Sequence, residues 1–430
     1  MGLNRSTMIV FLIYYVIITI PPGVLQLALP RLLGRDCSDG HLARTPNDTA
    51  DACRSAARMQ TGVVLAMFYV SPFVTGVPMG WLAATINSRW LFCSGLLVHA
   101  AATLMLAAST SFALLSVSAA VFGTGTVIGL VTTSSIVAAT YAEESPRSRV
   151  FGACYFSATL GFAITFLVGG WAYETFGHRM VFASVTVMFL LAIVAFVATN
   201  YTTMTSLLPT DYSYEIIPLR ATTKPDSTVD SRNVSSERTY FRFLTDPFAI
   251  FALAQIILVY TGLSTAMATS PTHLQHKFGI CIPTNGVILG VSTFIDAFLL
   301  VLVTIFVRTN RMRWITLSTF VLLLSAGFVT YPFLVHPFAA IGPETCIRGT
   351  RAVMMAFGPS LVLRIVDARA VGTYEQASAL YVLGKQGGEI LGSLTAPWLA
   401  DAFGFDALYF SMSAVFAPVA VASVVYAKLS

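Results

Sequence analysis

Residues 200–246 divide the chain and read NYTTMTSLLPTDYSYEIIPLRATTKPDSTVDSRNVSSERTYFRFLTD. This segment is rich in Thr, Ser, Asp, Arg and Pro, and it contains no apolar run. A segment of this composition does not bury enough apolar surface to form a core, so we expect a soluble linker. The apolar sequence on either side of it therefore predicts two separate units.

Each side of the linker contains long apolar runs separated by short polar turns. A helix needs about 20 mainly apolar residues to cross a bilayer. We therefore expect an all-α membrane protein with twelve transmembrane helices in two six-helix bundles, 1–199 and 247–430, joined by the cytoplasmic linker 200–246. Two such repeats are typical of transporters that expose a central site to each side in turn. The predicted runs lie at about 8–33, 61–84, 91–108, 111–140, 150–173 and 179–199 in the first unit, and at about 247–270, 284–307, 314–335, 346–366, 371–398 and 404–428 in the second.

The composition excludes an ordinary soluble protein. Of the 430 residues, 56% are hydrophobic and 10% are charged, and the mean hydropathy is +0.76. Soluble domains average about 25% charged residues. The sequence also lacks the alternating segments of a transmembrane β-barrel, so we expect helices as the spanning elements.

The distribution of basic residues predicts the orientation. With the N-terminus in the cytoplasm, the cytoplasmic segments contain 15 Lys and Arg residues and the outer segments contain 7. Basic loops prefer the cytoplasmic side, so we expect both termini in the cytoplasm and a location in the plasma membrane.

The predicted outer loop between the first two helices contains a glycosylation sequon and two cysteines. Of four Asn-x-Ser/Thr sequons in the chain, only Asn47 faces outward in this orientation, where glycosylation is possible. A disulfide between Cys37 and Cys53 is our first expectation on this oxidising side. A link from this loop to Cys281 and a set of unpaired thiols are the alternatives.

The residues from Gly80 to Arg89 read GWLAATINSR and follow the second apolar run. The major facilitator superfamily has Gly-x-x-x-Asp-Arg-x-Gly-Arg-Arg at this place, where it latches the cytoplasmic side. The chain resembles that family in its six-plus-six pattern and retains Gly80 and Arg89 of this gate motif. Ala84 replaces the Asp.

Two further features resemble branches of the same superfamily. Gly161, Gly169 and Gly170 are similar to the glycine-rich antiporter segment of its fifth helix, with Phe166 where the family has Pro. The long outer loop with two cysteines is similar to that of the proton-coupled folate and heme carriers and their many fungal relatives.

Five ionisable side chains lie within predicted membrane helices of the second unit. Each costs at least about 2.5 kcal/mol to insert, which indicates a function, and the superfamily layout implies that their helices line a central cavity. Depths counted at 1.5 Å per residue from the outer helix ends place Asp296 and Lys385 at the midplane, with Glu389 one turn farther out and Arg351 within side-chain reach of the Glu389 level. We expect a network in which Asp296 or Glu389 takes up and releases a proton, while Arg351 and Lys385 hold an anionic group or neutralise the empty site. The alternative is a static set of buried pairs that fixes helix packing. These residues are Asp296, Arg348, Arg351, Lys385 and Glu389.

The first unit has no charged residue in the middle of a predicted helix. Its expected cavity helices instead offer aromatic, hydroxyl and amide groups, which suit an amphipathic organic molecule. The candidates for substrate binding are Tyr14, Tyr15, Gln26, Tyr69 and Tyr155.

These patterns predict a secondary active transporter that works by alternating access. We expect proton-coupled efflux of an amphipathic small organic molecule, such as a secondary metabolite or drug-like compound. Proton-coupled uptake of an organic anion is the alternative, and a non-transporting sensor or scaffold is a further one. The expected partners are this substrate, protons and the lipid bilayer, for a monomer that binds no nucleic acid. The sequence shows no nucleotide motif, metal-ligand spacing or catalytic cluster, so we expect no cofactor, no metal and no enzymatic activity.

Overall fold

The computed structural model describes the backbone of residues 5–34, 46–109, 111–140, 144–205, 247–307, 310–369 and 374–429. These residues form long helices in two groups, which we call the N bundle and the C bundle. The N bundle consists of α1 (Arg5–Ile17), α2 (Ile20–Gly34), α3 (Pro46–Thr85), α4 (Ser88–Ala108), α5 (Phe112–Thr140) and α6 (Glu144–Thr205). The C bundle consists of α8 (Pro247–Phe278), α9 (Ile282–Phe306), α10 (Asn310–Thr330), α11 (Ile341–Arg369), α12 (Tyr374–Phe403) and α13 (Phe405–Leu429), with the short 3₁₀ helices η2 (Tyr331–Phe333) and η3 (Pro337–Ala340) before α11.

Proline and glycine explain the two breaks in the N bundle. Pro21 and Pro22 have no N–H to donate to the carbonyls of Ile17 and Ile18, so the first predicted helix is divided into α1 and α2. Gly177 has a φ of 74° and kinks α6, which contains the fifth and sixth predicted helices.

Nine helices in the described part of the chain are long and apolar enough to cross a membrane. One of these segments, 149–200, contains both predicted runs of α6. The set does not include α11 and α12, the tenth and eleventh predicted helices, and both of these carry several charged residues. A helical membrane fold is therefore confirmed, whereas the count of twelve stays a prediction.

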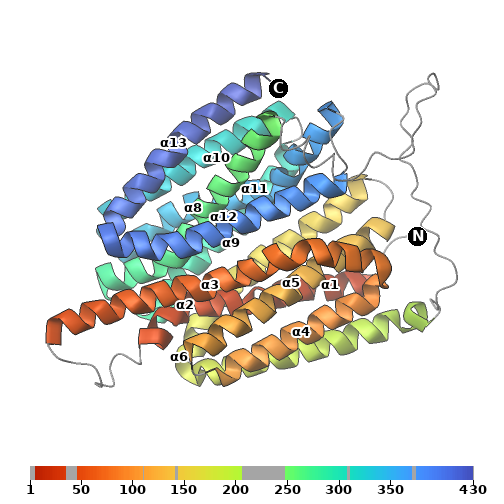
Figure 1. Cartoon of the computed structure of the whole chain (residues 1–430), viewed down its shortest axis with the longest axis horizontal. Helices are drawn as coiled ribbons and strands as arrows, with labels where there is room; N and C mark the ends of the chain where they lie inside the picture. Colours follow the sequence, from red (N-terminus) through yellow and green to blue (C-terminus); the bar gives the residue numbers. More distant parts are fainter. Residues whose placement is uncertain are drawn as a thin grey trace.

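The two bundles lie side by side with their long axes roughly aligned (Figure 1). Each has its own hydrophobic core, formed around Tyr14 and Phe92 in the N bundle and around Tyr260 and Phe328 in the C bundle. The end of α6 and the start of α8 lie at one end of the molecule, together with the start of α1 and the end of α13. We call this the linker end and the opposite end the far end.

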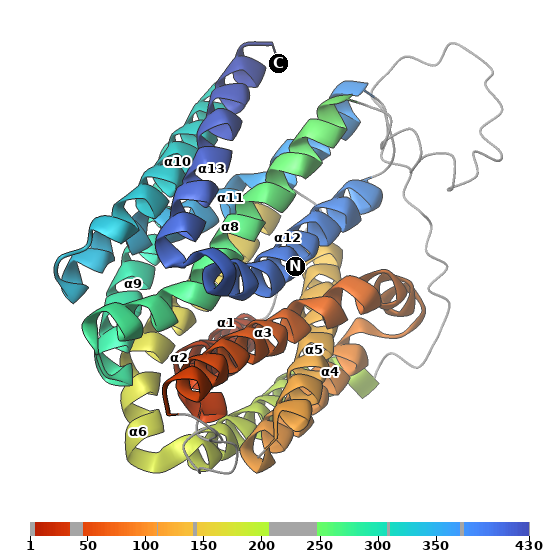
Figure 2. The ribbon, with the colours of Figure 1, turned by 60° about the vertical axis from the view of Figure 1, so that its left-hand side comes forward.

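Two pairs of helices make the main contacts between the bundles. Figure 2 shows α12 beside α3, and the first part of α6 packs against α9. We call these two contacts the seam. Gly62 of α3 faces the backbone carbonyl of Ser393, and Gly286 of α9 faces the backbone carbonyl of Phe166. Small residues at these positions let the helix backbones approach closely.

Candidate functional site

Asp296 of α9 and Arg351 of α11 form a buried ion pair. Arg351 Nη2 lies 3.1 Å from Asp296 Oδ2, and the exposed fractions of the two residues are 6% and 0%. The Arg351 guanidinium also lies 5.1 Å from the ring centroid of Phe162 in α6, on the opposite bundle. The pair thus lies at the seam, where a relative movement of the bundles changes its surroundings.

Arg348 forms a second buried pair on the same face of α11. Its Nε donates to Glu344 Oε2 at 2.8 Å, and Tyr331 donates its hydroxyl hydrogen to the other oxygen of Glu344. The Arg348 guanidinium lies 5.0 Å from the ring centroid of Phe166. Both arginines of α11 therefore contact an aromatic ring of α6, one turn apart.

The sequence prediction did not include Glu344, because this residue lies just before the predicted run 346–366. Its spacing of four residues from Arg348 could have identified it as a partner, since side chains at this spacing meet on a helix surface.

Lys385 and Glu389 of α12 form a looser pair. Their charged atoms are 3.9 Å apart, and Glu389 Oε2 has no hydrogen-bond partner. Lys385 Nζ lies 5.7 Å from the ring centroid of Tyr260, and the Tyr260 hydroxyl is hydrogen-bonded to that of Tyr381 at 3.0 Å. This pair is thus surrounded by tyrosines.

The N-bundle candidates have different positions. Tyr69 of α3 interacts electrostatically with Glu389 and Arg351, so it faces the charged residues. Tyr155 packs 6.4 Å from the ring of Tyr15 and interacts electrostatically with Tyr260. The structure therefore brings Tyr69 and Tyr155 toward the C bundle.

Gln26 contacts the C bundle, whereas Tyr14 lies inside the N bundle. Gln26 Nε2 donates to the Met267 carbonyl across the bundles at 2.8 Å. Tyr14 is fully buried inside the N bundle, beside Phe92, His99 and Gly129, and is not at the seam.

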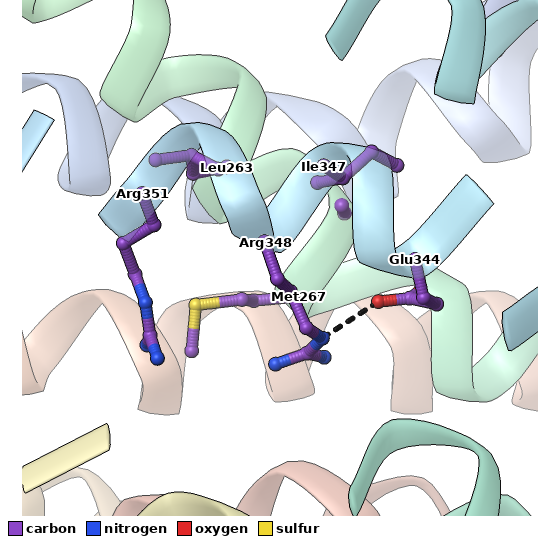
Figure 3. Close-up of a pocket in the computed structure, with 7 residues that line it drawn as sticks. Leu263, Met267, Glu344, Ile347, Arg348 and Arg351 are labelled. Carbon is purple, nitrogen blue, oxygen red and sulfur yellow. Dashed lines mark hydrogen bonds and ion pairs between the residues drawn. The ribbon is translucent and has the colours of Figure 1, made fainter. Parts of the chain in front are cut away.

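A small pocket lies between α8 and α11, beside the two arginines (Figure 3). Its cavity volume is about 10 Å³, which is about the space that one water molecule needs. In Figure 3 the Arg348 and Arg351 side chains extend to the same side of α11, with the Met267 side chain between them. The residues lining the pocket are Leu263, Ala266, Met267, Glu344, Ile347, Arg348 and Arg351.

A fourth ion pair lies at the far end and, unlike the first three, joins the two bundles. Asp401 of α12 accepts a hydrogen bond from Ser55 Oγ at 2.7 Å and lies 3.0 Å from Arg58 Nε of α3. The Arg58 guanidinium also lies 5.6 Å from the Phe405 ring centroid. The sequence prediction missed this pair because both residues lie just outside the predicted runs 61–84 and 371–398, where a charge has no insertion cost to mark it.

Some predicted residues lie outside the described part. The side chains of Cys37, Cys53 and Asn47 and the surroundings of Gly80 belong to this group. Of the gate motif, Arg89 is described: it lies at the start of α4, and its backbone N–H donates to the Asn87 side chain at 3.0 Å.

The charges of the site balance. Asp296 and Glu344 offset Arg351 and Arg348, and Glu389 offsets Lys385. An additional charge bound here would be unbalanced in a medium of low dielectric constant, which is costly. The arrangement can therefore link the binding of an ion to the protonation of a carboxylate.

Comparisons with known proteins agree with this architecture. A family model described as Major Facilitator Superfamily matches residues 6–374. The MFS-type transporter ppzB of Metarhizium rileyi is 32% identical to the chain over 123 residues, and that of Metarhizium majus is 33% identical over 128 residues. These matches cover 29% and 30% of the chain, and the chain spans only 25% and 28% of the length of these relatives.

A solved structure has a similar fold. The crystal structure of a mutant of the peptide transporter POT in complex with sulfate gives a TM-score of 0.70 at 15% sequence identity. The alignment covers 98% of this chain and 94% of that one.

Proposed function

The chain belongs to the Major Facilitator Superfamily, whose members are membrane transporters and not enzymes, and from this premise we propose a proton-coupled secondary active transporter that works by alternating access. The Asp296–Arg351 pair is the observation that carries the proposal, because a buried carboxylate that loses its cationic partner tends to become protonated. The contact of Arg351 with Phe162 couples this pair to the opposite bundle.

The proposed substrate is an amphipathic small organic molecule. Tyr69, Tyr155, Tyr260 and Tyr381 supply aromatic surface around the Lys385–Glu389 pair. Binding sites for such molecules are mainly apolar, with a few polar groups that fix orientation. The side chains around the pair have this character.

Two directions of transport are candidates. The glycine-rich segment of α6 led us to expect export in exchange for protons, although Phe166 replaces the family's Pro. Two buried guanidinium nitrogens, Arg348 Nη1 and Arg351 Nε, have no hydrogen-bond partner among the described residues, which favours the second candidate, proton-coupled uptake of an organic anion. We further propose a monomer in the plasma membrane with cytoplasmic termini and a glycosylated Asn47.

Sealed proteoliposomes with an imposed pH gradient test the proposal. We expect labelled amphipathic compounds to accumulate only while the gradient is maintained, and to accumulate on the acidic side for exchange or on the alkaline side for co-transport. We expect Asp296→Asn or Glu389→Gln to abolish proton-driven accumulation while sparing substrate exchange, because exchange requires no change of protonation. Normal accumulation in both variants would instead indicate that the charged residues only fix helix packing.

A further inference from the structure

We propose that the hydrogen bond from Gln26 to the Met267 carbonyl is a latch that holds the far end closed, and that Pro271 creates its acceptor. This inference goes beyond the proposed function, because it concerns how the two bundles separate and not what they carry. It depends on a missing backbone donor in α8, on the burial of the contact and on the equivalent positions of its two residues.

Pro271 leaves one backbone carbonyl of α8 without its usual partner. In an α-helix each carbonyl accepts a hydrogen bond from the N–H four residues later. Proline has no N–H, so Pro271 cannot donate to the Met267 carbonyl. That carbonyl accepts instead from Gln26 Nε2 of α2, at 2.8 Å. A side chain of the N bundle thus completes the backbone hydrogen bonding of a helix in the C bundle.

Burial makes this donor necessary for closure. Gln26 is 2% exposed, and the neighbours of Met267 in the chain, Ala266 and Ala268, are 2% and 6% exposed. A backbone carbonyl that is buried without a donor costs about as much free energy as a lost hydrogen bond. When the far end opens, water reaches the carbonyl and replaces the donor. Without Gln26, the closed state alone would therefore contain an unpaired carbonyl, and the equilibrium would shift toward the open state.

A second amide side chain holds the proline segment from within the C bundle. Asn285 Nδ2 of α9 donates to the Pro271 carbonyl at 2.9 Å, and Asn285 is fully buried. This bond joins two helices of the same bundle, so it persists when the bundles separate. The bond from Gln26 crosses between the bundles, and opening of the far end must break it.

The two latch residues occupy equivalent positions in the two bundles. Gln26 and Met267 each lie four residues before a proline, Pro30 in α2 and Pro271 in α8. The same 241 residues separate the two latch residues and the two prolines. Equivalent positions of parallel repeats face each other across the axis that relates the two halves. Each helix also lacks one backbone hydrogen bond at this level, which makes it easier to bend where the latch lies.

Met267 also connects the latch to the charged residues. Its side chain lies between those of Arg348 and Arg351 and lines the small cavity beside them (Figure 3). Its backbone carbonyl accepts the hydrogen bond from Gln26. A movement of the two arginines is therefore transmitted to the latch through a single residue.

Labelling of an introduced cysteine in the full chain, in lipid nanodiscs, tests the latch. Pro397 of α12 is buried against Gly62 of α3, so a thiol introduced by Pro397→Cys reacts with maleimide when the far end opens. Peptide mass spectrometry after timed labelling gives the rate at this position alone. We expect Gln26→Met to raise the rate at least fivefold, which is the size expected when one buried hydrogen bond is lost.

A second substitution tests the role of the proline. Alanine or serine at position 271 has an N–H that donates to the Met267 carbonyl in both the closed and the open state. We therefore expect Gln26→Met to change the labelling rate less than twofold when Pro271→Ala is also present. Pro271→Ser should give the same result and is an independent variant for this test.

Gln255→Met is the matched control. Gln255 lies in the same helix α8, is 3% exposed, and donates from Nε2 to Ser423 Oγ at 2.8 Å within the C bundle. The substitution therefore removes a buried glutamine hydrogen bond of the same length that does not cross between the bundles. We expect it to leave the labelling rate unchanged.

Three results would overturn the inference. They are an unchanged rate with Gln26→Met, an equal increase with Gln255→Met, and an increase with Gln26→Met that is the same with and without Pro271→Ala. The measurement needs no substrate and no pH gradient, so it is independent of the proposed function. A protein that shows the expected rates but accumulates nothing with a pH gradient keeps the latch and loses the function, and the converse result keeps the function and loses the latch.

Discussion

Phe162 and Phe166 couple the charges of one bundle to the other. Each ring lies about 5 Å from an arginine guanidinium, and such a cation–π contact contributes about 2 kcal/mol or more when it is desolvated. Proline at position 166 would not supply this ring. The departure from the family's antiporter segment therefore has a physical role in this chain, because it gives Arg348 an aromatic surface across the seam.

Cys281 offers a chemical reporter at the far end. It is an exposed free thiol in the turn between α8 and α9, and its hydrogen bond with Thr284 Oγ1, 3.1 Å long, lowers the pKa of the thiol. A lowered pKa means that thiolate, the form that reacts with maleimide, is present at lower pH than in an ordinary cysteine. We expect Thr284→Val to raise this pKa and shift the labelling profile of Cys281 to higher pH. Peptide mass spectrometry after timed labelling measures the shift, and an unchanged profile would show that the hydrogen bond has no effect on the thiol.

The helices themselves could be predicted because each apolar run has a length set by the bilayer. The run at 91–108 became α4 (88–108), and the run at 404–428 became α13 (405–429). The ion-pair partners could not be predicted in this way, since Asp296 and Arg351 are 55 residues apart and meet through the packing of α9 on α11. Depth along the helices placed Arg351 near the level of Glu389, and in the structure Arg351 pairs with Asp296 while it also acts electrostatically on Glu389.

Close helix approach also depends on particular glycines. Within the N bundle, His99 lies against Gly125 and Tyr14 lies against Gly129. Gly62 and Gly286 matter more for the seam, because each faces a backbone carbonyl of the other bundle, which cannot rotate away as a side chain can.

Substitution of Gly286 should separate α9 from α6. An added methyl group would overlap the Phe166 carbonyl, so we expect Gly286→Ala to lower stability by about 1–3 kcal/mol. Gly152→Ala in α6 is the matched control, because nothing lies within 4 Å of its added Cβ and alanine favours a helix. Thermal unfolding in detergent should show a lower midpoint for Gly286→Ala and no decrease for Gly152→Ala. Equal midpoints would show that the two helices have room to move apart.

The molecule as a whole is closed at its far end. Among the residues that the structure describes, the hydrogen bonds and ion pairs between the bundles are those of Gln26 with Met267, Ser55 with Asp401 and Arg58 with Asp401. All three lie toward the far end, as do the contacts of Gly62 and Gly286. A transporter that alternates must break these contacts to open this end, so their strength sets how often it opens.

The Arg58–Asp401 pair therefore should control opening of the far end. The two side chains are 22% and 14% exposed, and a pair of this kind contributes about 1 kcal/mol, so Asp401→Asn should raise the open fraction about fivefold. Pro397 of α12 is buried and its side chain lies in the seam against Gly62, which makes Pro397→Cys a reporter that reacts only when the far end opens. We expect an impermeant maleimide to label the introduced thiol about five times faster when Asp401→Asn is added, because closure loses its charged contact.

Arg31→Gln is the control, since it removes an ion pair that lies within the N bundle and does not join the two bundles. An unchanged labelling rate with Asp401→Asn would show that the helix packing around Gly62 and Gly286, and not the ion pair, holds the far end closed.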